Sequence, residues 1–188
     1  DFEVVVSEQK KVSRNFLKVT NDTRTTAIAE GSKMFLQSQG LWKKMKQYVE
    51  PIKKIKVIDE NAKSNIDFIN PSTKSNLGYI IKNSHLISLL TKELKKKNNV
   101  KILTGVKINS ISDEKKEITC FSQSKKIVSK LIIAADGKNS SVRKILGTNF
   151  FKKNYKEKAL VINFFHEKPH KNIAYEFFLK TGPLAILP

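Results

Sequence analysis

The chain has 188 residues, a formal net charge of +19 and 39% hydrophobic residues. This length can bury the core of one compact domain or of parts of two, and no apolar run approaches the roughly 18–20 residues that cross a bilayer. The single Cys120 excludes an internal disulfide and the three histidines are scattered, so we expect a reducing compartment and no bound metal.

The positive charge suggests binding to nucleic acid or to anionic lipid as one hypothesis for the function. Only Arg14, Arg24 and Arg143 of the 36 basic residues are arginine, and the lysines fall in short groups along the whole chain. Arginine is the residue that holds phosphates and bases with paired hydrogen bonds. We therefore interpret the lysines as a solubilising surface and expect no specific nucleic-acid partner.

The first quarter of the chain predicts one strand and two helices. Residues 4–6 are three valines, typical of a short buried strand, which ends near Glu8. One of residues 21–23 can cap a helix whose apolar positions continue at mostly helical spacing to Gly40. Leu41-Trp42 then begins a second short helix.

The middle of the chain predicts a hairpin, a helix and further strands. Apolar residues alternate between 52 and 69, which is typical of exposed hairpin strands, and residues 77–81 are expected to continue that sheet. A leucine stripe predicts an amphipathic helix over residues 84–97, with lysines near its C-terminal end. The strands expected next lie at 101–103 with 106–108, at 117–121 and at 127–135.

An apolar run leads into an acidic turn near residue 136. Residues 131–134 suit a strand buried on both faces, and Asp136-Gly137 is a turn pair that can approach a ligand closely. Ser140 or Ser141 can cap the following helix, leaving amide groups free to face an anion with Arg143 nearby. The segment predicts a place for a pyrophosphate; the alternative is an ordinary strand-to-helix turn.

The remainder predicts a helix and an antiparallel region. The helix covers residues 142–146, and the strands cover 159–165, 174–179 and 185–187. We expect an α/β chain with α+β elements, in which two kinds of sheet interleave. The sequence opens on Asp1 without a methionine and stops within an apolar run, so we interpret it as an incomplete fragment.

Four groups of segments, in this order and at these separations, resemble the aromatic-ring flavin monooxygenases, most closely the ubiquinone-biosynthesis hydroxylases. The segments are residues 22–28 (DTRTTAI) with 40–42 (GLW), 77–83 (LGYIIKN), 135–143 (ADGKNSSVR), and 174–178 (AYEFF) with 182–188 (GPLAILP). Each motif is weak by itself, and their order carries the resemblance.

The resemblance implies a Rossmann-like FAD-binding domain, over residues 1–50 and 81–150, interleaved with an antiparallel or mixed β-sheet substrate domain, over 51–80 and 151–188. Two family elements are expected outside this sequence. They are the Gly-rich turn that binds the FAD pyrophosphate, before Asp1, and a Gly-Asp motif beyond Pro188. We therefore expect the fragment alone to bind FAD poorly, if it folds.

Four residues outside the acidic turn are candidates for cofactor binding. Glu8 ends the first strand, where an acidic side chain accepts hydrogen bonds from ribose hydroxyls, although it also suits a surface position. By resemblance Arg24 contacts FAD near the pyrophosphate, rather than forming a surface ion pair. Asn83 faces the flavin or its ribityl chain, or else caps a helix. Val106 lines the adenine pocket by resemblance, or is a core valine.

The acidic turn supplies the other candidates. By resemblance Asp136 belongs to an Asp-Gly motif that binds FAD and is implicated in contact with the nicotinamide cofactor. Gly137 allows close approach, Ser140 caps the helix, and Arg143 supports the charge. We assign no catalytic residue; His166, His170, Tyr175 and Glu176 are acid–base candidates without an assigned role.

The resemblance implies an FAD-dependent enzyme that uses NAD(P)H and dioxygen to hydroxylate an aromatic ring through a flavin hydroperoxide. We expect a lipid-borne substrate, a polyprenylated phenol of ubiquinone biosynthesis. We also expect a cytoplasmic location, at the inner face of a membrane or in a biosynthetic complex. The alternatives are a flavin-dependent epoxidase, halogenase or reductase, and a non-catalytic basic module that binds nucleic acid or anionic lipid.

Overall fold

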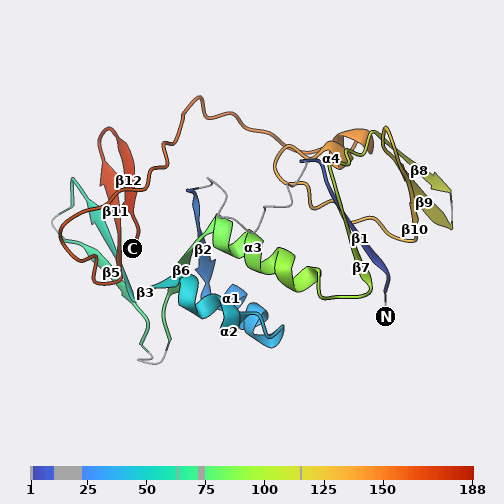
Figure 1. Ribbon diagram of the computed structural model, residues 1–188. Coiled ribbons are helices and arrows are strands. Elements are labelled where there is room, and N and C mark those ends of the chain that lie inside the picture. Colours follow the sequence, from blue (N-terminus) through green and yellow to red (C-terminus); the bar gives the residue numbers. More distant parts are fainter. Residues whose placement is uncertain (1, 11–22, 63, 72–74, 115) are drawn as a thin grey trace. The chain divides into compact units, whose positions relative to one another are not determined.

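The computed structural model describes residues 2–10, 23–62, 64–71, 75–114 and 116–188. These residues form strands β1 to β12, helices α1 to α4 and the 3-10 turn η1 (Figure 1). The chain divides into two compact units. Unit 1 comprises Asp1–Phe16 and Glu93–Ala159, and unit 2 comprises Leu17–Lys92 and Leu160–Pro188. The predicted mixture of helices with parallel and antiparallel sheets is confirmed.

A parallel pair of strands opens unit 1. β1 (Val4–Glu8) pairs with β7 (Val100–Thr104), so that Glu8 lies opposite Thr104. The predicted strand is confirmed, but its predicted burial is wrong, because Val4 and Val5 are exposed. Among the described residues only β7 pairs with β1. A valine run gives an extended backbone, but burial needs neighbours on both faces.

The second sheet of unit 1 is an antiparallel meander of β8 (Ser110–Glu114), β9 (Glu117–Phe121) and β10 (Lys126–Ser129). The strands expected near residues 117 and 127 are confirmed, whereas the strand expected at 106–108 is wrong. That segment connects the two sheets: the Val106 N–H donates to the Glu8 carbonyl at 3.0 Å, and the Asn109 N–H donates to the Phe121 carbonyl at 2.8 Å.

The predicted strand at residues 131–135 is also wrong. The structure has no strand there, and the side chains of Leu131 and Ile133 are 71% and 79% exposed. No strand among the described residues pairs with this segment, and an apolar segment with no hydrogen-bonding partner forms no sheet. The helix that follows is confirmed as α4 (Ser141–Ile145).

Unit 2 contains an antiparallel sheet in which β6 (Gly78–Lys82) lies between β2 (Thr25–Ala29) and β3 (Val49–Ile52). We predicted that a helix contains Ala27 and Ile28 and begins near Arg24, and this is wrong. The consecutive threonines Thr25 and Thr26 favour an extended backbone and pair with β6. The helix therefore begins only after β2, at Glu30. The prediction that residues 77–81 join the hairpin sheet is wrong as well, because β6 pairs with β2 and β3.

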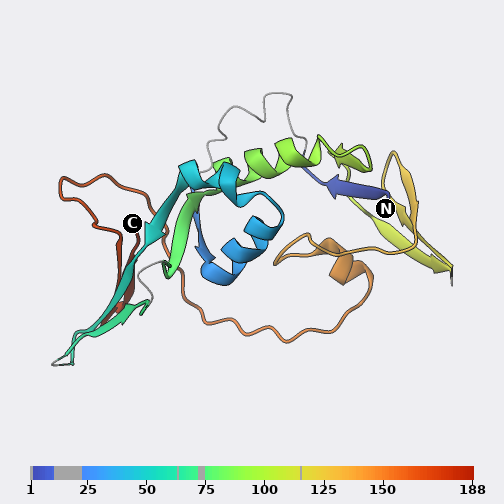
Figure 2. The same cartoon turned by 90° about the horizontal axis from the view of Figure 1, so that it is seen from below.

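Three short helical elements follow β2. They are α1 (Glu30–Ser38), α2 (Trp42–Met45) and η1 (Lys46–Tyr48), and Figures 1 and 2 show α1 and α2 side by side next to β6. Gly40 ends α1 with a φ of +68°, a left-handed conformation that glycine adopts without steric cost. The predicted helix end and the predicted second helix are confirmed.

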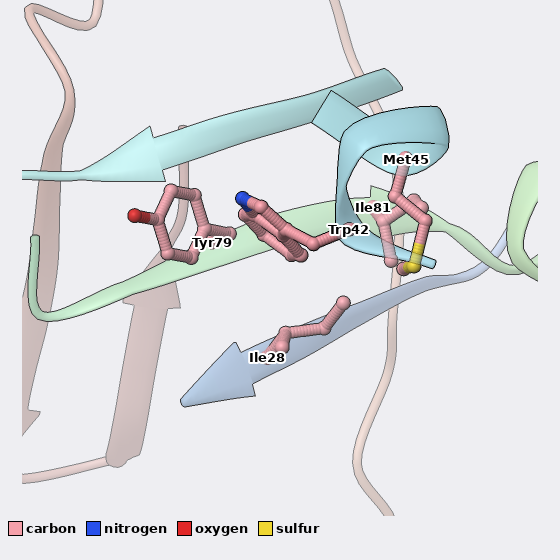
Figure 3. Close-up of a cluster of buried hydrophobic side chains, with 5 residues drawn as sticks. All are labelled: Ile28, Trp42, Met45, Tyr79 and Ile81. Carbon is pink, nitrogen blue, oxygen red and sulfur yellow. The ribbon is translucent and has the colours of Figure 1, made fainter. Parts of the chain in front are cut away.

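The core of unit 2 lies between these helical elements and the sheet. Trp42 and Met45 come from α2, and their side chains meet those of strands β2 and β6 (Figure 3). The rings of Trp42 and Tyr79 pack edge to face with centroids 4.7 Å apart. Gly78 is required here because a Cβ atom would lie 2.9 Å from the Ile28 carbonyl oxygen. The buried cluster is Ile28, Trp42, Met45, Tyr79 and Ile81.

The amphipathic helix is confirmed as α3 (Asn83–Leu94), which directly follows β6. Its side chains Leu86 and Leu89 pack against the core cluster, as the leucine stripe predicted.

A second sheet of unit 2 has the strand order β12-β11-β4-β5. The predicted hairpin is confirmed as β4 (Lys54–Asp59) with β5 (Ile66–Ile69), and β11 (Ile173–Leu179) pairs with β12 (Gly182–Ile186) as an antiparallel hairpin. β11 also runs parallel to β4. The strand predicted at 159–165 is wrong: the segment is exposed and has no regular structure.

Candidate functional site

Glu8 and Val106 meet at the carboxyl ends of the parallel strands β1 and β7. The Val106 N–H donates to the Glu8 carbonyl at 3.0 Å, and the Ser7 hydroxyl donates to the Val106 carbonyl at 3.0 Å. Val106 is buried, and the Glu8 carboxylate accepts from the Lys10 N–H at 2.8 Å. Ligands of parallel sheets bind beyond the carboxyl ends of the strands, so both candidates lie where a dinucleotide is expected.

Arg24 and Asn83 meet in unit 2, where β6 passes into α3. The Asn83 N–H donates to the Arg24 carbonyl at 2.9 Å. The Thr26 hydroxyl donates to the side-chain oxygen of Asn83, which fixes the orientation of that amide. The antiparallel register, with Thr25 opposite Lys82, brings the two candidates together from positions 59 apart in the sequence.

Asp136 is tightly bound to the start of α4. Its Oδ2 atom accepts from the Ser141 N–H at 2.6 Å, the Ser141 hydroxyl at 3.1 Å and the Val142 N–H at 3.2 Å. Of the two predicted caps, Ser140 or Ser141, it is Ser140 that caps the helix, because its hydroxyl oxygen accepts from the Arg143 N–H at 3.0 Å. The expectation that these amides are free for an external anion is therefore wrong.

The same contacts fix the charge of Asp136. Hydrogen bonding by the Ser140 side chain is the largest cause that lowers the pKa of Asp136. Burial opposes it, and hydrogen bonds from the Val142 and Ser141 amides and the Ser141 hydroxyl bring the pKa down to about 2. The carboxylate is therefore ionised near neutral pH and supplies the negative charge that a helix N-terminus favours. Asp136 thus orders the turn from within the chain.

Gly137 leaves the turn open. Its φ is +80°, and a Cβ atom built there would meet no atom within 4 Å. The Ser140 N–H donates to the Gly137 carbonyl at 3.1 Å, which closes the turn. The positive φ is typical of an Asp-Gly turn, and the approach of a ligand to this backbone stays a prediction.

Arg143 holds the same loop through its guanidinium group. One guanidinium nitrogen donates to the Lys138 carbonyl at 2.6 Å, and the guanidinium lies 4.3 Å from the centre of the Phe150 ring. Its Nε atom is buried and has no hydrogen-bond partner among the described residues. Arg143 is thus a positioning residue for the turn, and its contact with a cofactor stays a prediction.

Each group of residues carries chemistry that suits part of a dinucleotide. In unit 1 a carboxylate such as that of Glu8 can accept hydrogen bonds from ribose hydroxyls, and a Cβ atom at Gly137 would meet no atom within 4 Å. In unit 2 a guanidinium such as that of Arg24 suits a phosphate, and the Asn83 amide is oriented by Thr26. Within the described ranges no cluster of three His, Cys, Asp or Glu side chains could hold a metal ion. Nor is any helix in those ranges long and apolar enough to span a membrane.

The chain belongs to the FAD-binding domain family, which matches residues 11–180. This confirms the predicted family and FAD as its cofactor. Ubiquinone hydroxylase UbiL of Rhodospirillum rubrum is 27% identical over 168 residues, and the mitochondrial ubiquinone biosynthesis monooxygenase COQ6 of Danio rerio is 29% identical over 192 residues. The matches cover 89% and 96% of this chain but 39% of each relative, so the chain spans about two fifths of their length.

A solved structure confirms the fold class. The p-nitrophenol 4-monooxygenase PnpA of Pseudomonas putida superposes with a TM-score of 0.61 at 20% identity, covering 77% of this chain and 37% of that one. At this identity the likeness concerns the fold alone. The predicted mixed α/β arrangement of a flavin monooxygenase is therefore present in this chain.

One feature of unit 2 was missed by the sequence analysis. A hollow of about 500 Å³ lies beside β11 and β12, where the loop before β11 meets the sheet. The sequence signal was the alternation of Ile173, Tyr175 and Phe177 beyond a loop rich in histidine and lysine, but nothing in it indicated that the loop folds over the strands. The residues around the hollow are His166, Lys168, Pro169, His170, Lys171, Ile173, Tyr175, Ile186 and Leu187.

Proposed function

We propose that this chain is part of an FAD-dependent monooxygenase that hydroxylates the aromatic ring of a polyprenylated phenol in ubiquinone biosynthesis. The observation that carries the proposal is the family match over residues 11–180, together with one relative named as a ubiquinone hydroxylase and one named as a ubiquinone biosynthesis monooxygenase, which match 89% and 96% of the chain. The proposed partners are NAD(P)H, dioxygen and the lipid-borne ring.

The residues of unit 1 are proposed to hold the adenosine side of FAD. Glu8 accepts hydrogen bonds from the ribose hydroxyls, and Val106 supports it through the bond to the Glu8 carbonyl. Asp136, Ser140 and Arg143 keep the turn in shape, so that FAD or the nicotinamide cofactor can approach the backbone at Gly137.

The residues of unit 2 are proposed to hold the charged and flavin-proximal parts of the cofactor. The Arg24 guanidinium pairs with the pyrophosphate. The Asn83 amide, oriented by Thr26, donates toward the flavin or its ribityl chain. Bound FAD supplies the redox chemistry that joins NAD(P)H, dioxygen and the ring.

The substrate is proposed to bind to the β-sheet part of the chain, in the division expected from the sequence: residues 51–80 and 151–188 for substrate, and 1–50 and 81–150 for FAD. The hollow beside β11 supports this assignment because its volume of about 500 Å³ is in the range of small-molecule sites. The sheet holds the ring and excludes water from it.

The protein is proposed to act at the inner face of a membrane, peripherally or in a biosynthetic complex. Its lipid-borne substrate and the net charge of +19 support this, because anionic lipid attracts clustered lysines.

The test uses the full-length protein with bound FAD. NAD(P)H oxidation and oxygen uptake are measured with and without a short-chain polyprenylated phenol, and the product is analysed by mass spectrometry. We expect a product heavier by one oxygen atom, with the oxygen derived from labelled dioxygen. An epoxide, a halogenated ring or a reduced product would favour another enzyme of this fold. DNA binding with steep salt dependence, without flavin uptake, would favour the basic module.

A further inference from the structure

The chain that leaves α4 combines exposed aromatic rings with exposed lysines. Residues 150–158 (FFKKNYKEK) form no helix or strand and continue from α4 as an irregular segment (Figure 1). Phe150, Phe151 and Tyr155 are 55%, 90% and 68% exposed. Such rings leave apolar area in contact with water, and an exposed apolar patch marks an interaction surface. We refer to residues 150–158 as the basic aromatic segment.

The charge of the basic aromatic segment is almost entirely positive. Glu157 is its only acidic residue, against four lysines that are all exposed. No ion pair within the described residues involves any of these lysines. Their charge therefore acts on the surroundings of the protein instead of being neutralised inside the chain. The lysines are Lys152, Lys153, Lys156 and Lys158.

Two of the three rings are held by neighbouring cations. The Arg143 guanidinium lies 4.3 Å from the centre of the Phe150 ring, and the Lys153 ammonium lies 5.0 Å from the centre of the Tyr155 ring. The Phe151 ring has no aromatic or cationic contact within the described residues. Phe151 is therefore the ring that is open to an apolar partner.

The chemistry of the segment fits an anionic bilayer better than a nucleic acid. Its cations are all lysines, which act as point charges, whereas paired hydrogen bonds to phosphates need arginine. At a bilayer surface, lysines meet the anionic headgroups while aromatic rings enter the boundary with the acyl chains. The lipid-borne substrate proposed above lies in a bilayer, so the enzyme has to reach the same surface.

We propose that the basic aromatic segment binds the surface of a bilayer that contains anionic lipid. Its four lysines pair with the lipid phosphates, and the Phe151 ring inserts at the level of the headgroups. The inference rests on the proposed function, because it names the surface through which the enzyme reaches a lipid-borne substrate. Binding then depends both on headgroup charge, which salt screens, and on an apolar contact, which salt does not screen.

The test measures the binding of the full-length protein with bound FAD to lipid vesicles by sedimentation at low ionic strength. The vesicles contain phosphatidylcholine alone, or phosphatidylcholine with about one quarter phosphatidylglycerol. We expect the partition coefficient for the anionic vesicles to be at least about tenfold higher. The flavin absorption of each purified variant shows that it is folded, so that lost binding is not lost structure.

The lysines are tested by a variant and a matched control that remove the same charge. In the variant Lys152→Gln/Lys153→Gln/Lys156→Gln/Lys158→Gln, the partition coefficients for the two kinds of vesicle should agree within about twofold. The control removes four exposed lysines elsewhere on unit 1 and should retain the preference for anionic vesicles. It is Lys101→Gln/Lys107→Gln/Lys125→Gln/Lys130→Gln.

The apolar contact is tested by a second pair of variants. Phe151→Ala should lower the partition coefficient for anionic vesicles by about threefold or more. The same ratio should hold at higher salt, because an apolar contact is not screened. Phe2→Ala, which removes a ring that is 87% exposed elsewhere on unit 1, is the control and should bind like the natural protein.

Equal binding to neutral and anionic vesicles would overturn the inference. So would a preference that survives in the four-lysine variant or disappears in its control, and so would unchanged binding of Phe151→Ala. Tighter binding of a single-stranded oligonucleotide than of vesicles would assign the segment to nucleic acid instead. Hydroxylation of a short-chain phenol in solution by a protein that binds no vesicles would refute this inference while the proposed chemistry stands. Segment-dependent vesicle binding without hydroxylation of any ring would support the surface and contradict the proposed function.

Discussion

Two apolar runs of this chain differ in burial. In β6 the side chains of Ile80 and Ile81 are 6% and 1% exposed, whereas Leu131 and Ile133 are 71% and 79% exposed. β6 has a hydrogen-bonded strand on each side and α2 above it, while residues 131–135 pair with no strand in the described ranges. The comparison teaches that an apolar sequence permits burial, but that the neighbouring elements decide whether it occurs.

The largest expected effect tests this difference directly. Ile81→Ala should lower the free energy of unfolding of the chain by about 3 kcal/mol, because it leaves a cavity beside Met45. Ile133→Ala, the matched change in the exposed run, should alter it by less than about 0.5 kcal/mol. Urea unfolding followed by circular dichroism measures both. Similar losses for the two variants would contradict the comparison.

Each apolar run is followed by residues proposed to bind the cofactor. Substitutions at Arg24 and Asn83, next to β6, should weaken FAD binding more than substitutions in the turn at Asp136. Arg24→Gln in the full-length protein should weaken FAD binding by about tenfold or more, since a charge-assisted bond to a phosphate is lost. Flavin fluorescence during titration of the apoprotein measures the affinity. Lys43→Gln, an exposed lysine of α2, is the control and should bind FAD normally.

Loss of Asp136, which follows the exposed run at residues 131–135, should have a smaller effect, and this effect is on the stability of the fold. Asp136→Ala removes the acceptor of the Ser141 and Val142 amides while the Ser140 cap stays in place, so the free energy of unfolding should fall by about 1 kcal/mol, the usual net contribution of a hydrogen bond. Chemical denaturation of the full-length protein near neutral pH reports the change. Unaltered stability would mean that the Asp136 contacts do not hold the turn.

The smallest expected effect is the change with pH in the stability difference between the natural protein and Asp136→Ala. The pKa of Asp136 is lowered to about 2 in the folded chain, below its value of about 3.9 when unfolded. Its contribution to stability is therefore complete above about pH 4 and is lost as the pH falls toward 2. The stability difference between the natural protein and Asp136→Ala should shrink over this range in denaturation curves. A difference that grows with acidity would contradict the assignment.

Patterns within a few neighbouring residues correctly predicted the helices and strands whose formation depends on nearby residues. The leucine stripe located α3, alternation located β4 and β5, and Ser140 is the cap of α4. The strand β2 was taken for a helix because its extended form depends on pairing with β6, about 50 residues away.

The candidate site residues could likewise be predicted singly, but not their arrangement in the folded chain. Position in the sequence and the family resemblance predicted Glu8, Val106, Arg24 and Asn83 as candidates, but only the folded strands show that they meet in pairs. The free amides expected before α4 are used by Asp136, which folds back five residues, and no spacing rule distinguishes that contact from a ligand contact. The hollow beside β11 also needs the folded loop, because Lys171 on its edge belongs to a turn with positive φ.

The most direct test of the account is the flavin content of the full-length protein, purified without added cofactor and titrated with FAD. The account predicts stoichiometric FAD with a flavin absorption spectrum, and bleaching of that spectrum on anaerobic addition of NAD(P)H. A folded full-length protein that takes up no FAD at concentrations that saturate related flavoproteins would contradict it.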